Sequence, residues 1–246
     1  MVWFYILWSG LFGLLIGSFL NVCIYRLPRK ENIAVGRSHC TSCGHTLSAS
    51  DLIPVLSYLL LRRRCRYCGQ PISPRYAIVE SLTAILYMVQ AAIIRPQEPD
   101  RLLALLLVTC WFTAVLLVWA AIRLDGQKPP RMLYLFMVLP AIIRLILQPD
   151  HSLAMLVGMI GVVLVQLVLV WLNLITRDNP DSGHEILTLS VSGLMLGILP
   201  VAPVMVFECI LLLILATSRK LKTQWFPCLM AAAIWICLLL NLAGLF

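Results

Sequence analysis

Long, nearly uncharged apolar stretches are the feature that most restricts how this chain can fold. A helix needs about 20 apolar residues to cross a bilayer core about 30 Å thick, where backbone polar groups must be satisfied within helices or closed barrels. The chain is 61% hydrophobic and only 12% charged over 246 residues, which is too apolar for a soluble domain of this length. We therefore expect an all-α polytopic membrane protein whose solvent is the lipid bilayer.

Eight of these stretches are candidate transmembrane helices. The sixth and seventh are short and flank Pro200 and Pro203, so one long kinked helix is an alternative for that region. The eight stretches are Trp3–Tyr25, Ala77–Ile94, Leu102–Ile122, Met132–Leu147, Leu153–Ile175, Ile186–Leu199, Val204–Ser218 and Phe226–Phe246.

The distribution of basic residues predicts the orientation of these helices. With eight spans and the amino terminus outside, only Arg95, Arg101 and Arg144 of the 19 Lys and Arg residues fall on the outside. Lys and Arg concentrate in the cytoplasmic loops of membrane proteins, so both termini are expected on the periplasmic side. This topology accounts for the net charge of +8, which therefore gives no reason to expect a nucleic-acid partner.

The polar segment between the first two spans carries two CxxC pairs. Cys40 and Cys43 form the first pair, and Cys65 and Cys68 form the second after 21 intervening residues. Two such pairs at this separation are typical of a closed four-thiolate zinc site, which is structural because no coordination position remains for water. Two disulfides or a redox pair are alternatives, but the predicted cytoplasmic location disfavours persistent disulfides. Iron is the other metal that four thiolates accept.

Three segments around these cysteines carry a recognisable pattern. The first is Gly13–Pro28, which ends the first span with Arg-Leu-Pro. The second, Ser50–Leu59, lies between the CxxC pairs, and the third, Pro71–Glu80, leads into the second span. Together with the CxxC pairs, these segments resemble a known family, the type 4 prepilin peptidases (prepilin leader peptidase/N-methyltransferases), and Phe226–Leu229 is a weaker match to a further family segment.

The resemblance implies an eight-span protein of the bacterial inner membrane with a zinc module on its cytoplasmic side. We accordingly expect three parts: residues 1–25 as the first transmembrane helix, 26–76 as the zinc-binding domain, and 77–246 as a membrane-embedded helical domain of the aspartyl-peptidase type. The resemblance further implies cleavage of leader peptides from prepilins or pseudopilins, in company with assembly proteins of type IV pili or type II secretion. Many members also N-methylate the new amino terminus with S-adenosylmethionine.

The chain departs from the family at the two aspartates that the resemblance implies for cleavage. Arg123 falls at the first position and Glu185 at the second. Glu185 retains a carboxyl group, whereas a guanidinium stays protonated and acts neither as a base nor as a useful proton donor. Asp125 takes the first role if the following loop is two residues shorter, although such a shift turns a helical side chain by about 200°. Pairing of His184 with Asp125 or Glu185, or an ion-paired cytoplasmic rim without catalysis, are further alternatives.

Glu80 is a charged residue within the second predicted span. Such residues are candidates for function by default, and pairing with an arginine near the interface is the equally weighted alternative. Three functions are therefore compared: an active prepilin peptidase that also methylates, a catalytically degraded homologue that binds pilins as a membrane scaffold, and a methyltransferase without cleavage. Whether the chain is a working protease depends on Arg123, Asp125 and Glu185.

Overall fold

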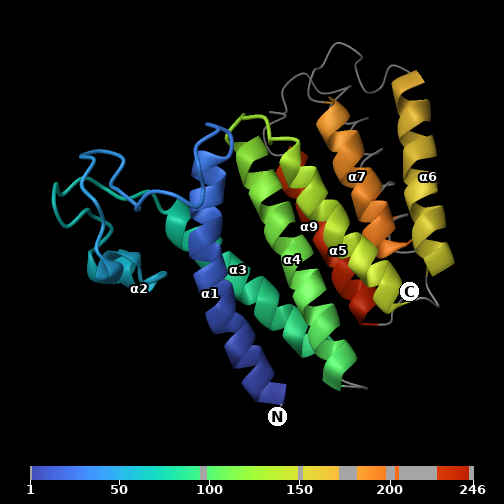
Figure 1. Cartoon of the computed structure of the whole chain (residues 1–246), viewed down its shortest axis with the longest axis horizontal. Helices are drawn as coiled ribbons and strands as arrows, with labels where there is room; N and C mark the ends of the chain where they lie inside the picture. Colours follow the sequence, from blue (N-terminus) through green and yellow to red (C-terminus); the bar gives the residue numbers. More distant parts are fainter. Residues whose placement is uncertain are drawn as a thin grey trace. The chain divides into compact units, whose positions relative to one another are not determined.

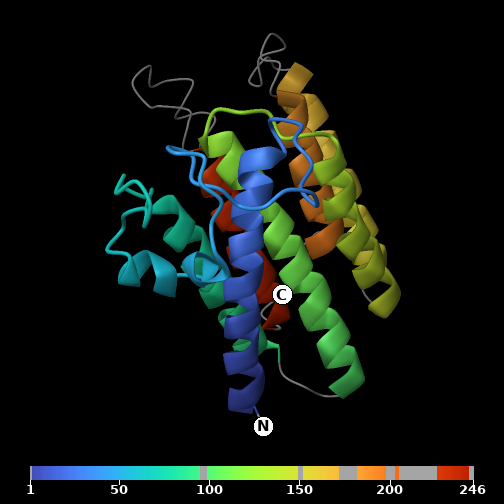
Figure 2. The same cartoon turned by 60° about the vertical axis from the view of Figure 1, so that its left-hand side comes forward.

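The computed structural model describes residues 2–94, 99–148, 152–171, 182–197, 203–204 and 226–243, and all the secondary-structure elements named in these ranges are helices. The chain divides into two compact units, Met1–Ala92 and Ile93–Phe246. Figures 1 and 2 show the helices in two views. The predicted all-α class is confirmed.

The first unit contains two long helices and, between them, a small irregular module. Helix α1 spans Val2–Arg26 and α3 spans Arg75–Ile93. The module holds the 3-10 helix η1, Ala49–Leu52, and the short helix α2, Leu56–Leu60.

Helices α1 and α3 pack closely because α1 presents glycine backbone to α3. A Cβ added at Gly13 would lie 2.6 Å from Ala84 Cα, and one at Gly17 would lie 2.7 Å from Glu80 Cα. Residues four apart lie on the same helix face, and small residues at this spacing let membrane helices approach closely. This contact surface, the α1–α3 seam, runs antiparallel and extends to Asn21, whose Nδ2 donates to the Tyr76 carbonyl oxygen at 3.1 Å.

The end of α1 is joined to the module by a buried arginine. The Arg26 guanidinium donates to the carbonyl oxygens of Asn32 and Val35, both at 2.9 Å, and to those of Gly36 at 3.2 Å and Arg37 at 3.4 Å. These four acceptors satisfy the guanidinium inside the protein, which a buried charge requires. The loop that leads to the first cysteine pair is therefore held against the end of α1.

The second unit is a bundle of apolar helices. Helix α5 packs against α4, α6 and α7, and α9 packs against α4 and α7. The bundle core includes Phe112, Trp119, Met137, Met195, Ile234 and Leu238, all under 2% exposed. The helices are α4 (Pro99–Leu124), α5 (Met132–Leu147), α6 (Ser152–Trp171), α7 (Ser182–Leu196) and α9 (Phe226–Leu242).

Three helices of the described part are long and apolar enough to cross a membrane: Trp3–Arg26, Arg75–Ile93 and Leu103–Leu124. Met132–Leu147, Leu153–Leu164 and Leu229–Leu242 are shorter apolar helices. Helix α7 begins one turn before the predicted start and ends before Gly197, whose φ of +89° a glycine adopts without strain. Of the predicted span Val204–Ser218, only Val204 is among the described residues. The count of eight transmembrane helices therefore stays a prediction.

Candidate functional site

The two CxxC pairs fold into two turns of the same design. In the first, the Gly44 N–H donates to the Cys40 carbonyl oxygen at 2.8 Å, and the Cys40 N–H donates to the His45 carbonyl oxygen at 2.9 Å. In the second, the Gly69 N–H likewise donates to the Cys65 carbonyl oxygen, at 2.9 Å. Both glycines have a left-handed φ, +72° and +70°, which explains why glycine follows each pair.

The two turns bring all four thiol sulfurs together. The Sγ atoms of Cys40, Cys43, Cys65 and Cys68 all lie within 4.8 Å of one another, and those of Cys40 and Cys68 are 3.9 Å apart. A tetrahedral zinc ion with bonds of about 2.3 Å separates its sulfur ligands by ~3.8 Å. The donor set and its spacing therefore fit a four-thiolate metal ion, and the cluster is able to bind a metal.

The surroundings of Cys40 favour its thiolate form. Desolvation raises the pKa of this thiol, but hydrogen bonds from the backbone N–H groups of Cys43 and Ser42 outweigh it and lower the pKa to about 6. Thiolates are the metal-binding form of cysteine. The first turn is thus prepared to supply a ligand near neutral pH.

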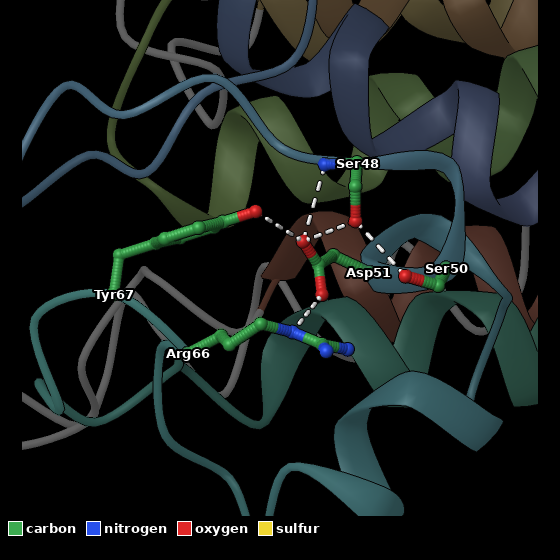
Figure 3. Close-up of polar contacts among 5 residues, drawn as sticks. All are labelled: Ser48, Ser50, Asp51, Arg66 and Tyr67. Carbon is green, nitrogen blue, oxygen red and sulfur yellow. Dashed lines mark hydrogen bonds and ion pairs between the residues drawn. The ribbon is translucent and has the colours of Figure 1, made fainter.

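A carboxylate anchors the second turn to the chain before α2 (Figure 3). Asp51 Oδ2 accepts hydrogen bonds from the Ser48 hydroxyl at 2.7 Å, the Ser48 N–H at 3.1 Å and the Tyr67 hydroxyl at 3.2 Å. Asp51 Oδ1 accepts from Arg66 Nε at 2.8 Å. The Ser48 hydroxyl, followed by the Ser48 N–H and Arg66, holds the pKa of Asp51 below its usual value. Asp51 is therefore a buried, ionised acceptor.

The same tyrosine joins the two cysteine turns to each other. The Tyr67 ring lies next to that of His45, with 3.6 Å between the centroids and an interplanar angle of 32°. Because Tyr67 follows Arg66 in the second turn and His45 belongs to the first, the ring contact and the Asp51 hydrogen bonds fix one turn against the other. The sequence pattern did not assign a role to Asp51, although Ser48 three residues earlier is the signature of a capped turn.

A cavity of about 340 Å³ opens between α1, the module and α3. Its lining includes Tyr25 and Arg26 from α1, Tyr58 from α2, and Tyr76 and Glu80 from α3. Arg26 and Glu80 are buried, at 8% exposed each. The volume lies in the range of pockets that bind small molecules, and the lining mixes aromatic and aliphatic side chains with many polar and charged ones.

Glu80 accepts a hydrogen bond from the backbone of the module. Its Oε2 receives the Val55 N–H at 2.7 Å. Val55 has φ +61° and ψ −47°, and the next N–H, that of Leu56, donates to the Pro54 carbonyl oxygen at 2.6 Å. This tight turn is strained, above all for a β-branched residue. Glu80 thus stabilises an unfavourable turn at the edge of the cavity, and strained backbone of this kind concentrates at functional sites.

The residues expected to cleave lie in the second unit. Helix α4 ends in a Schellman motif, in which the Gln127 N–H donates to the Ile122 carbonyl oxygen at 3.1 Å and Gly126 has φ +70°. Asp125 is the exposed last residue before this turn, whereas Arg123 is partly buried. The two side chains therefore differ in exposure at the end of the helix.

His184 and Glu185 lie in the first turn of α7. Their side chains lie outside the described part of the chain, so the pairing of either with Asp125 stays a prediction. Helix α5 packs against both α4 and α7, which places it beside each of the two helices that carry the expected catalytic positions.

Comparison with known proteins matches the amino-terminal region to a family. Residues 11–94 fit the family described as the bacterial peptidase A24 N-terminal domain. The chain carries an A24 N-terminal domain. The family predicted from Gly13–Pro28, Ser50–Leu59 and Pro71–Glu80 is confirmed, since all three segments lie within the matched residues.

Curated relatives of this A24 chain are named for prepilin processing. The chain is 55% identical over 75 residues to a prepilin leader peptidase/N-methyltransferase of Myxococcus xanthus, which covers 30% of this chain and 22% of that protein. It is 40% identical over 157 residues to the protein of that name from Aeromonas hydrophila, with 54% and 52% covered. A type 4 prepilin-like proteins leader peptide-processing enzyme of Escherichia coli is 38% identical over 136 residues, with 48% of each covered.

The chain thus spans about half or less of the length of these relatives. The A24 match ends at residue 94 and does not include Arg123, Asp125, His184 or Glu185. No solved structure matches the chain.

Proposed function

We propose that this A24 chain processes prepilins or pseudopilins at the bacterial inner membrane, as a leader peptidase and N-methyltransferase of type IV pilus or type II secretion systems. The A24 N-terminal domain carries the proposal, because its cysteine module is folded and, together with α1 and α3, lines a cavity with the buried charged residues Arg26, Asp51 and Glu80. Relatives matched at 38–55% identity are named for this processing. The proposed partners are leader peptides and the assembly proteins that receive the processed pilins.

The proposed topology follows the positive-inside rule. Residues 26–76 form the zinc-binding domain on the cytoplasmic side, residues 1–25 the first transmembrane helix and residues 77–246 the membrane-embedded domain, with both termini periplasmic. Zinc held by Cys40, Cys43, Cys65 and Cys68 supports the fold of the module and takes no part in the chemistry, because the four thiolates complete its coordination.

The cavity of the first unit has the chemistry to hold the methyl donor. S-Adenosylmethionine carries a sulfonium cation, an ammonium group and a carboxylate. The Glu80 carboxylate and the tyrosine rings suit a cation, whereas the terminal nitrogens of Arg26 already donate to four backbone carbonyl oxygens. S-Adenosylmethionine would supply the methyl group, while these side chains bind and orient it.

Leader cleavage requires two carboxyl groups that share a proton, one to activate water and one to protonate the leaving group. Glu185 and Asp125 are the proposed pair. Arg123 works against this chemistry wherever it lies near Glu185, because a guanidinium stabilises the ionised carboxylate.

Arg123 is also the observation that favours a second candidate function. In a methyltransferase or pilin-binding scaffold without protease activity, the first unit keeps its cavity while the carboxylate pair of the second unit is dispensable. All residues that line the cavity belong to residues 18–80, so methyl-donor binding does not require Arg123 or Glu185.

A leader-cleavage assay on the full chain in lipid distinguishes the two candidates. Asp125→Ala and Glu185→Ala are expected to lower the cleavage rate by about 10²–10⁴-fold, the usual contribution of a general acid or base. Glu31→Ala, which removes an exposed carboxylate of the module, is the control that keeps wild-type cleavage. If the Arg123→Asp variant cleaves and the wild type does not, the peptidase proposal is wrong and the second candidate function takes its place.

Methyl-donor binding is measured separately by calorimetry with S-adenosylmethionine on the same preparations. Glu80→Gln keeps an acceptor for the Val55 N–H but loses the negative charge, and is expected to weaken binding at least roughly tenfold. Glu185→Ala is expected to bind like the wild type. Equal affinity of Glu80→Gln and the wild type would show that the cavity does not hold the donor through Glu80.

A further inference from the structure

Five large aliphatic side chains of the module are exposed next to one another in sequence. Their exposed fractions run from 39% at Leu52 to 71% at Leu60. They belong to η1, to α2 and to the residue after η1. Exposed apolar surface of this kind marks an interaction site. We call Leu52, Ile53, Leu56, Leu59 and Leu60 the leucine patch.

Three consecutive arginines follow the leucine patch after one intervening residue, Leu61. Arg62, Arg63 and Arg64 are all exposed, and residues 52–64 contain no acidic residue. The surface therefore combines apolar side chains with a concentrated positive charge. A basic peptide would be repelled by it, whereas an anionic surface would be attracted.

The backbone shows that these arginines are kept at a conformational cost. Helix α2 ends in a Schellman arrangement, in which the Arg63 N–H donates to the Tyr58 carbonyl oxygen at 2.9 Å and the Arg62 N–H to that of Leu59 at 3.0 Å. Glycine normally occupies the left-handed position of this motif. Here Arg62 has φ +50° and Arg63 has φ +63°, a conformation that L residues with a side chain rarely adopt. The turn would form more easily without these two side chains, which indicates that their charge has another use.

Within the first unit, α2 lies alongside the length of α1 (Figure 1). Helix α1 is long and apolar enough to span the membrane. In Figures 1 and 2 α2 lies level with the apolar length of α1 and not beyond its Arg26 end. Where α1 spans the membrane, a segment beside it with exposed leucines is within reach of lipid.

We propose that the leucine patch and Arg62–Arg64 form a docking surface for an anionic lipid bilayer. The aliphatic side chains lie among the acyl chains just below the headgroups, and the guanidinium groups bind the lipid phosphates, as in membrane-associated amphipathic segments. Because α2 also lines the cavity through Ser57 and Tyr58, docking holds the cavity at the membrane surface.

Photo-crosslinking of the full chain in nanodiscs tests this docking. p-Benzoylphenylalanine is placed at Leu60 and, as the control, at Val35. The two side chains are similarly exposed, Leu60 at 71% and Val35 at 69%, but Val35 lies in the loop held by Arg26. In phosphatidylglycerol-rich nanodiscs, position 60 is expected to form lipid adducts in several-fold excess over position 35. Arginines near an anionic surface contribute roughly fivefold each, so phosphatidylcholine nanodiscs should give a much lower yield at position 60.

Arg62→Gly combined with Arg63→Gly separates lipid binding from folding. The double variant removes two charges and also relieves two left-handed residues, so its thermal midpoint is expected to equal or exceed that of the wild type. Its lipid adducts at position 60 are expected to fall by an order of magnitude. Equal adduct yields in both lipids and in the double variant would overturn the proposal. So would adducts to a second copy of the chain in place of lipid.

Discussion

Asp51 illustrates how one side chain organises the cysteine module. It collects four hydrogen bonds, two from Ser48 and one each from Arg66 and Tyr67, although it is neither a predicted metal ligand nor a predicted catalytic residue. Arg66 and Tyr67 are the two residues between Cys65 and Cys68. Loss of the carboxylate therefore affects the position of the second cysteine turn.

We predict that Asp51→Asn destabilises the module by about 1–3 kcal/mol, since the new amide NH₂ cannot accept from Ser48 and leaves buried donors without a partner. The measurement is the rate of proteolysis within residues 38–73 of the purified full chain. Ser50→Ala is the matched control, because the Ser50 hydroxyl bonds only that of Ser48 in Figure 3. Equal proteolysis of Asp51→Asn and Ser50→Ala would contradict this role.

The same residue predicts a pH dependence. The folded-state pKa of Asp51 is lowered, so its stabilising contribution is fully present above the unfolded pKa of about 3.9. The contribution is lost as the pH falls through the lower folded value. The stability difference between wild type and Asp51→Asn should therefore be constant above about pH 5 and shrink below about pH 4. A difference that grows on acidification would have the wrong sign.

At the scale of elements, the α1–α3 seam depends on two glycines. We predict that Gly13→Ala destabilises the first unit by about 1–3 kcal/mol, because its Cβ would lie 2.6 Å from Ala84 Cα and the helices must separate. The measurement is unfolding of the full chain in mixed micelles. Gly161→Ala is the control, since a Cβ at that helical glycine meets no atom within 4 Å. A loss of equal size in both variants would point to helix propensity in place of packing.

Local pattern predicted the elements of the module better than its contacts. The CxxC spacing was enough to predict that the four cysteines form one site, because each turn is determined within six residues. The Arg26 contacts with residues 32–37 and the Glu80 bond to Val55 depend on which segments meet after folding. The strained Val55 turn could not be predicted either, because valine disfavours it. For the catalytic positions, the sequence places Arg123 and Asp125 on one helix end, and the structure adds that Asp125 is the more exposed of the two.

At the scale of the whole molecule, the chain consists of two compact units that are stabilised in different ways. The first combines the seam with the four-cysteine cluster, and the second is a bundle with an apolar core. Metal binding contributes to folding only where the ligands lie, so its removal should affect the units unequally.

We predict that a strong chelator raises amide hydrogen exchange in residues 38–73 of the membrane-reconstituted chain and leaves exchange in α4, α5 and α9 unchanged. Mass spectrometry of peptic fragments provides the measurement, and re-addition of Zn²⁺ should restore protection. The quadruple variant with serine at all four cysteines should show the high exchange without chelator. Uniform loss of protection across both units would contradict their independence.

The seam also has a consequence for the order of synthesis. The cysteine module is translated after α1 and before α3, yet the seam glycines of α1 contact α3. The two ends of the module are therefore brought together only once α3 has entered the membrane, and until then loop closure opposes its folding. Ribosome-bound chains that stop before α3 should leave the four thiols reactive toward alkylating reagents, and chains extended past Ile93 should protect them.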